Sequence, residues 1–113
     1  MSYELDGIKA KNEKGECFQN NNWWWAPLRE YVLEFAGDCL NDEEREYWCS
    51  NDGNVVREEQ AIDIGNKLLK LIEEGHAEGF EELCSEILEC PFRVENVRNF
   101  AEFCINSGGF AIC

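Results

Sequence analysis

The sequence has few basic residues: ten lysines and arginines stand against 24 aspartates and glutamates, so the formal net charge is −14. Negative charge of this size is repelled by nucleic-acid phosphates and by anionic membrane surfaces, and we expect neither as a partner. A basic protein partner, divalent cations or simple solubility are all compatible with it. The charge therefore narrows the class of partner without identifying one.

Long apolar runs are also missing. No segment approaches the length needed to cross a bilayer, and residues 1–6 lack the basic start and the apolar stretch of a secretory signal. We therefore expect a cytoplasmic protein. In that compartment the seven cysteines, an odd number, are expected to be mostly reduced thiols rather than a disulfide framework.

Closely spaced metal ligands and catalytic motifs are absent as well. A structural zinc site usually has two cysteines separated by two to four residues, whereas the nearest pair here, Cys84 and Cys90, has five between. A zinc-binding or thiol-dependent protein stays open as an alternative, with the candidate ligands Cys39, Cys49, Cys84, Cys90 and His76. His76, the single histidine, is expected just past a helix C-terminus, where a capping role suits it at least as well as a general-base role. The sequence contains no phosphate loop, no nucleophile elbow and no metalloprotease helix motif, so no catalytic motif indicates an enzyme.

The turn at residues 49–54 has some features of a calcium-binding loop. With Gly53 at the sixth loop position, the third, fifth and twelfth positions hold Ser50, Asp52 and Glu59, which carry oxygen. The first position falls on Trp48, whose side chain has no oxygen to offer. A tight turn is therefore the preferred interpretation, and calcium stays an alternative.

The length of 113 residues fits one domain, and 44% hydrophobic and 12% aromatic residues are globular values. We predict a mainly α fold, a small bundle of four to five helices with a short terminal strand pair as an option. Residues 1–19 are expected to form an arm or loop with at most a short strand at 17–19, and residues 20–113 a packed helical core. The closing residues 110–113 are expected to be extended, with 17–19 as the suggested partner.

Apolar residues at helical spacing and the helix-breaking residues place the helices. The first is predicted to open at Pro27, because proline suits a first helical turn, and to end near residues 38–40. The others are predicted at residues 42–48, 57–74, 77–89 and 94–106, with 57–74 central. Within 77–89 the spacing predicts a buried face of Phe80, Leu83, Cys84, Ile87 and Leu88, opposite a solvated face that includes Glu78, Glu82 and Glu86.

Three of the four tryptophans, Trp23, Trp24 and Trp25, stand side by side after three asparagines. Consecutive side chains on a helix or strand cannot share one direction, so at least one indole must face elsewhere. We expect mainly core indoles whose N–H groups reach neighbouring carbonyls, with one partly exposed. The sharper alternative is an exposed aromatic platform, with the three asparagines Asn20, Asn21 and Asn22 supplying hydrogen bonds beside it.

Three segments, residues 21–28, 92–100 and 107–113, resemble stretches of uncharacterised small microbial proteins. The resemblance implies no activity, partner or site residue.

The charge and the aromatic density together favour an interaction module as the function. We expect it to bind a basic or aromatic-seeking protein through Glu78, Glu82 and Glu86 and the edge of the tryptophan cluster. An inhibitor or nucleic-acid mimic, whose carboxylates imitate phosphate spacing, is a narrower form of this hypothesis. A small-ligand or carbohydrate binder built on the tryptophans is the further alternative.

Overall fold

The computed structural model describes residues 2–50 and 52–113. Within them, four strands form one antiparallel sheet in the order β2, β1, β4, β3. The strands are β1 (Ser2–Gly7), β2 (Cys17–Asn21), β3 (Asn54–Val56) and β4 (Phe110–Ile112). The helices are α1 (Asn22–Phe35), α2 (Asp42–Tyr47), α3 (Glu58–Glu73), α4 (His76–Leu83) and α5 (Val94–Asn106), with short turns η1 (Glu13–Gly15) and η2 (Cys84–Leu88). The predicted mainly α class with a small sheet is confirmed.

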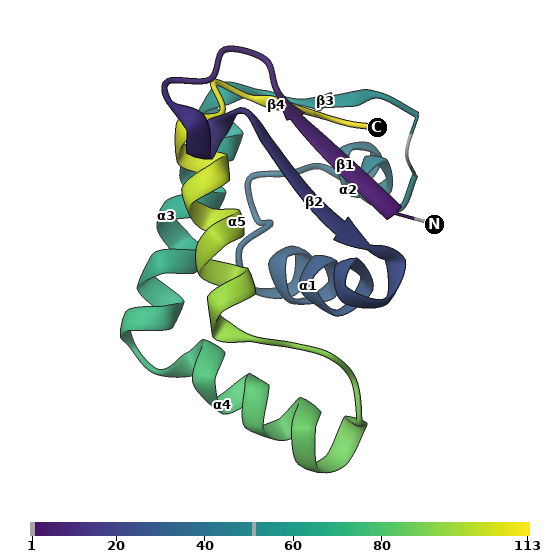
Figure 1. Cartoon of the computed structure of the whole chain (residues 1–113), viewed down its shortest axis with the longest axis vertical. Coiled ribbons are helices and arrows are strands. Elements are labelled where there is room, and N and C mark those ends of the chain that lie inside the picture. The colour runs from purple at the N-terminus through teal and green to yellow at the C-terminus, as the bar shows by residue number, and fades with distance from the viewer. Residues whose placement is uncertain (1, 51) are drawn as a thin grey trace.

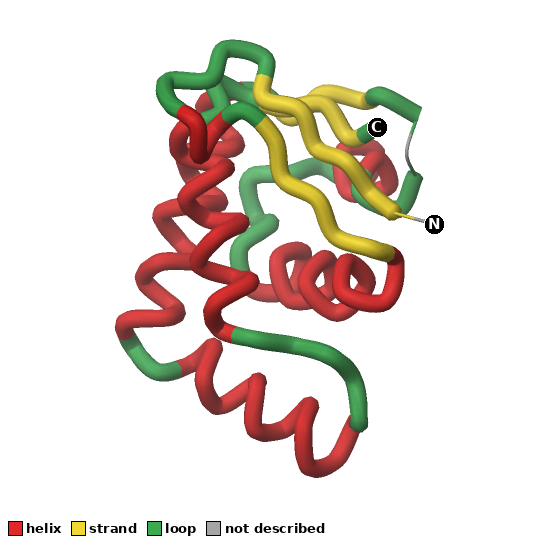
Figure 2. Tube along the Cα trace, in the orientation of Figure 1, coloured by secondary structure: helices red, strands yellow, loops and turns green. Residues whose placement is uncertain are grey.

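The elements form a sheet end and a helical end (Figure 1). Helices α3 and α5 lie side by side along one flank, and the sheet lies beside their upper part. Helix α1 crosses below the sheet, and α4 lies at the end of the molecule farthest from it, as the colouring by secondary structure in Figure 2 also shows. Among the described residues, no helix is both long and apolar enough to cross a membrane.

The expectation of an arm or loop over residues 1–19 is wrong, because this segment supplies two strands of the sheet. In β1 the buried Leu5 alternates with the exposed Glu4 and Asp6, the period-two pattern of a strand with one wet face. Strand β2 confirms the short strand expected at 17–19. The pattern is hard to read in sequence because each strand is short and rich in polar residues.

The C-terminal strand is confirmed, but its suggested partner is wrong. Strand β4 pairs with β1 and with β3, whereas β2 pairs with β1. The glycines of the first hairpin explain part of this arrangement. A Cβ on Gly15 would lie 1.9 Å from the Asn106 carbonyl oxygen, and one on Gly7 would lie 1.8 Å from the Gly15 carbonyl oxygen. The hairpin can therefore lie against the end of α5 only because both residues lack a side chain.

Helix α1 begins five residues before Pro27, so the predicted start there is wrong. The Asn21 side chain accepts the backbone N–H of Trp24 at 3.0 Å and caps the helix, as asparagine does at an N-cap. Pro27 leaves the Trp23 carbonyl without a helical donor. Trp23 itself is 66% exposed. The early cap therefore extends the helix through the whole tryptophan triplet.

The middle and last helices follow the sequence prediction. Helix α3 ends before Gly75, which has φ of 81°, and α5 occupies the predicted 94–106. Helix α2 is capped by Asn41, whose side chain accepts the Glu44 N–H at 2.8 Å while the Glu44 carboxylate accepts the Asn41 N–H at 3.0 Å. This reciprocal pair is a capping box.

The helix predicted at 77–89 is only partly confirmed. Helix α4 ends at Leu83, and the chain continues as the π-helical turn η2, closed by Glu89 at φ of 50° and by a bond from the Cys90 N–H to the Cys84 carbonyl of 3.2 Å. Wider π-helical turns shift the following residues around the helix axis. Of the predicted buried face, Cys84 is buried and Phe80 half-buried, whereas Leu83, Ile87 and Leu88 are exposed.

Candidate functional site

The tryptophan triplet divides between the core and two neighbouring surface hollows. Trp25 is fully buried, and its indole N–H donates to the Trp48 carbonyl at 3.4 Å, as predicted for a core indole. Trp24 is half-buried, and Trp23 is exposed. Successive residues on a helix point about 100° apart, so α1 presents one indole inward and two outward in different directions.

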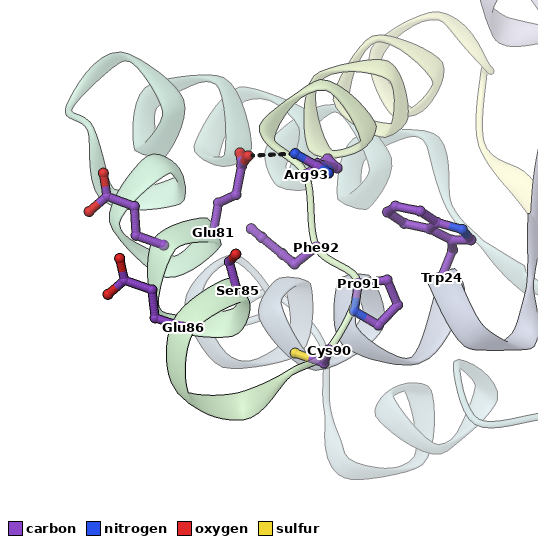
Figure 3. A pocket seen from close by; sticks show the side chains of 9 residues that line it. Trp24, Glu81, Ser85, Glu86, Cys90, Pro91, Phe92 and Arg93 are labelled. Carbon is purple, nitrogen blue, oxygen red and sulfur yellow. Dashed lines mark hydrogen bonds and ion pairs between the residues drawn. The ribbon is translucent and has the colours of Figure 1, made fainter.

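An acidic pocket of about 400 Å³ contains one of these outward indoles. Trp24 of α1 lies on one side, α4 and η2 lie on the other, and the segment from Cys90 to Arg93 runs between them (Figure 3). Its lining residues are Trp24, Glu81, Glu82, Ser85, Glu86, Cys90, Pro91, Phe92 and Arg93. The structure thus brings together Trp24, Glu82 and Glu86, which the sequence analysis named from separate segments.

The carboxylates of the acidic pocket are not equivalent. Glu81 accepts the backbone N–H of Val94 at 3.0 Å and lies 3.5 Å from the Arg93 guanidinium. It therefore caps the start of α5, whose N-cap residue Arg93 makes no side-chain cap. Glu82 and Glu86 are exposed, and Figure 3 places Glu86 at the outer rim, away from Trp24. These two are the charges that an incoming partner would meet.

Beside the acidic pocket lies an apolar groove of about 490 Å³, lined by Asn22, Trp23, Ala26, Pro27, Cys90 and Pro91. The two hollows share Cys90 and Pro91, which form a ridge between them. Trp23 lines the groove and Trp24 lines the pocket. Sequence reasoning had named neither Pro27 nor Pro91 as a site residue, and no periodic signal could have, because their role depends on two distant segments meeting.

A third hollow, the amide pocket, lies on another side of Trp24. It has a volume of about 280 Å³ and is lined by Asn20, Trp24, Arg93, Glu95, Asn96 and Asn99. The Asn20 and Asn96 amides bond each other at 2.9 and 3.3 Å, whereas Asn99 is exposed. Of the three asparagines named from the sequence, Asn20 lines this pocket beside Trp24, Asn21 caps α1, and Asn22 lines the apolar groove.

The remaining interaction candidate, Glu78, is exposed on α4 outside the acidic pocket. It lines a separate hollow with Ile72, Glu81, Glu82, Val94 and Arg98. Glu78 and Glu82 nevertheless lie one helical turn apart, since residues four apart are neighbours on a helix surface. Glu78 and Glu82 therefore belong to one acidic face of α4, and of these two only Glu82 lines the acidic pocket with Trp24.

The candidate metal ligands are dispersed. Within residues 2–50 and 52–113, no group of three or more histidine, cysteine, aspartate or glutamate side chains is placed to hold a metal ion. Cys84 and Cys90 lie close together through their backbone bond, but Cys39 and Cys49 lie in the loops before and after α2. Burial raises the pKa of Cys39 to about 11 and that of Cys84 to about 12, which disfavours the thiolate that binds metal or acts as a nucleophile.

His76 is occupied by aromatic neighbours rather than by a cysteine. Its Nδ1 lies 2.8 Å from the Tyr31 hydroxyl, and its ring centroid lies 4.5 Å from that of Phe35. Burial raises the pKa of Tyr31 to about 12. The calcium alternative also meets an obstacle, because Trp48, at the first loop position, is fully buried in the core.

Comparisons of the chain with protein-family models, with curated proteins and with solved structures found no match. A function must therefore be inferred from the geometry of this chain, above all around Trp24.

Proposed function

We propose that this protein is an interaction module that binds a basic segment of a protein partner at the acidic pocket. The observation that carries the proposal is that Trp24, Glu82 and Glu86 line one pocket. An indole face attracts a lysine or arginine side chain, and nearby carboxylates add charge-assisted hydrogen bonds. Tryptophan is also among the residues that contribute most to binding at protein interfaces.

The electrostatics support a basic protein rather than a nucleic acid as the partner. Three carboxylates and a single guanidinium line the pocket, and the whole chain carries a net charge of −14. Such a field accelerates encounter with a cationic surface and weakens as salt is added. The seven free thiols fit a reducing compartment such as the cytoplasm, where we place this interaction.

The test compares proteins captured from cells by wild type, by Trp24→Ala and by Glu82→Lys/Glu86→Lys. We expect wild type to retain a basic protein that salt releases and that both variants lose. The matched control is Glu13→Lys/Glu16→Lys, which reverses the same number of exposed charges near η1, far from α4 in Figure 1. An identical set of captured proteins for all four would refute the proposal.

A nucleic-acid mimic is the narrower form of this function. Glu78 and Glu82 of α4 and Glu86 of η2 are all exposed, and clustered carboxylates can imitate backbone phosphates. If the captured partner binds DNA or RNA, that nucleic acid should compete with this protein for it. If the partner binds this protein and its nucleic acid at the same time, these carboxylates do not act as a nucleic-acid mimic.

A carbohydrate ligand is the second candidate, and the amide pocket is the observation that favours it. An indole beside Asn96 and Asn99 offers a stacking face together with hydrogen-bond donors and acceptors. Screening a glycan array would test this. Binding that Asn99→Ala abolishes and that Glu86→Gln leaves intact would assign the ligand to the amide pocket. The zinc and calcium alternatives gain no comparable support from the described residues.

A further inference from the structure

We propose that the partner's binding segment carries two anchors, a lysine or arginine that enters the acidic pocket and a large apolar side chain that enters the apolar groove. This inference rests on the proposed function and specifies its ligand: a linear segment that crosses the ridge of Cys90 and Pro91. The two hollows share those two residues, so one short segment can reach both.

The tryptophans support this two-anchor arrangement. Trp23 and Trp24 are consecutive residues of α1, and each lines a different hollow. Because both belong to one rigid helix, the distance between the two anchor positions is fixed. A partner that fits one hollow is therefore offered the second at a constant spacing, which favours a segment over two independent ligands.

The apolar groove has little polar surface of its own to attract water. Of its side chains, only Asn22 is a hydrogen-bonding amide; the others are Trp23, Ala26, Pro27, Cys90 and Pro91. Trp23, the largest of these side chains, is 66% exposed. Exposed apolar side chains gathered in this way mark a binding surface.

Charge decides which occupant covers the apolar groove. A second copy of this chain would bring another net charge of −14 to the surface, and an anionic membrane would bring its own negative charge, so both are repelled. A basic segment is attracted instead, and its apolar residue then covers Trp23. Charge complementarity therefore favours a cationic and apolar segment of another protein.

The experiment is a selection from a random peptide library displayed on phage, with the full chain as the target. We expect the enriched peptides to share a lysine or arginine and a large apolar residue at one constant spacing. Trp23→Ser should weaken the best peptide by about 30-fold, the size expected for truncation of an aromatic hot spot. Glu82→Gln/Glu86→Gln should weaken it and flatten its salt dependence, whereas Glu13→Gln/Glu16→Gln should change neither.

Cys90 on the ridge provides an independent readout by mass spectrometry of thiol alkylation. The bound peptide should slow the alkylation of Cys90 and leave that of the exposed Cys49 and Cys113 unchanged. Equal rates with and without peptide would place the peptide elsewhere and overturn the inference. If the midpoint of chemical unfolding lies at the same denaturant concentration for Trp23→Ser as for wild type, the variant is folded.

The possible selections separate this inference from the proposed function. Basic peptides without a constant apolar position, or peptides that Trp23→Ser binds as well as wild type does, overturn the two-anchor inference and leave the proposed function standing. Peptides without basic residues, or no enrichment at all, overturn both. Self-association of the chain that Trp23→Ser abolishes would assign the apolar groove to a second copy instead.

Discussion

The two ends of α1 take part in two aromatic clusters that differ in their access to solvent. At the sheet end, Trp25 stacks with Trp48 at a centroid distance of 5.9 Å, and both contact Phe100; all three are fully buried. At the α4 end, Tyr31 contacts Phe35 and Phe80 at 5.0 Å each. There Phe35 is 40% exposed and Phe80 is half-buried.

A high density of aromatic residues therefore does not by itself distinguish a core from a binding site. Both clusters contain neighbouring rings at distances typical of favourable aromatic pairs. The two clusters differ in how far other elements enclose them. The sheet-end rings lie among β1, β4 and α5, whereas α4 and η2 lie at the end of the molecule, where Leu83, Ile87 and Leu88 are exposed. The sheet end therefore stabilises the fold, and the α4 end offers a surface.

The largest effect is expected from Trp25→Ala at the sheet end. Removing a fully buried indole leaves a cavity and costs about 3–5 kcal/mol of unfolding free energy. Urea unfolding followed by circular dichroism measures it. Trp23→Ala, two positions earlier in the same helix, is the matched control and should change stability by no more than about 0.5 kcal/mol, because the side chain is exposed. Equal losses for the two variants would show that the triplet is not divided between core and surface.

A pair of glycine substitutions should act with opposite signs in the two regions. A Cβ on Gly65 of α3 would lie 2.6 Å from Ile105 Cγ1 and 2.8 Å from the Ala101 carbonyl oxygen of α5. Gly65→Ala should therefore cost about 1–3 kcal/mol by overpacking. A Cβ on Gly79 of α4 would have no atom within 4 Å, so Gly79→Ala should gain about 0.5–1 kcal/mol from helix propensity.

Melting temperatures of both glycine variants provide the measurement. A gain for Gly65→Ala would mean that α3 and α5 are less closely packed than the structure indicates. A loss for Gly79→Ala would mean that α4 packs against a further surface.

A smaller, pH-dependent effect should distinguish a bonded carboxylate of α2 from the exposed ones of α4. Hydrogen bonds from the Asn41 N–H and then from the Gln60 amide lower the pKa of Glu44 below its ordinary value of 4.5. A lowered folded-state pKa contributes stability that is present above about pH 4.5 and is lost as the pH falls through the folded-state pKa. Glu44→Gln should therefore be less stable than wild type near neutral pH, and the difference should shrink in acid.

Unfolding in urea at a series of pH values measures the Glu44 effect. Glu46→Gln, which removes an exposed carboxylate from the same helix, is the matched control for the loss of one charge. A constant difference for Glu44→Gln would contradict the proposed cause.

The smallest effect is expected where periodicity had predicted core. Ile87→Ser and Leu88→Ser should each change the unfolding free energy by no more than about 0.5 kcal/mol, because both side chains are exposed. Thermal unfolding is sufficient to measure this. Cys84→Ser, in the same turn but fully buried, should be clearly less stable, since it places an additional hydroxyl among apolar groups. A large loss for Ile87→Ser would show that the α4 end is covered in solution.

Much of the helical architecture could be predicted because its signals are local. The residues of α5 repeat at helical spacing and end before Ser107 and two glycines, and its observed bounds agree with the prediction. Asn41 and Glu44 lie three residues apart, which is the whole capping-box signal. When the cap, the apolar spacing and the terminating residues of a helix all lie in one segment, the helix can be predicted without knowing which other elements it packs against.

The errors arose where the deciding partner is distant in sequence. Proline at position 27 favoured a helix start there, but the Asn21 cap and the burial of Trp25 among residues of other elements extend the helix to Asn22. The strand at residues 2–7 exists because β2 and β4 flank it. Ile87 lies in the π-helical turn η2 and is exposed, whereas the α-helical period had predicted it to be buried.

For the site, the available chemistry could be read from the sequence: an acidic chain with adjacent indoles that a helix must point in different directions. How these groups assemble into a pocket depends on the fold. In the folded chain, Trp24 lines one pocket with Glu82 and Glu86, Glu81 caps the start of α5, and Pro91 lines both hollows. The physical reason is that residue type and local spacing are properties of one segment, whereas a pocket exists only where α1, α4, η2 and the start of α5 pack around a shared space.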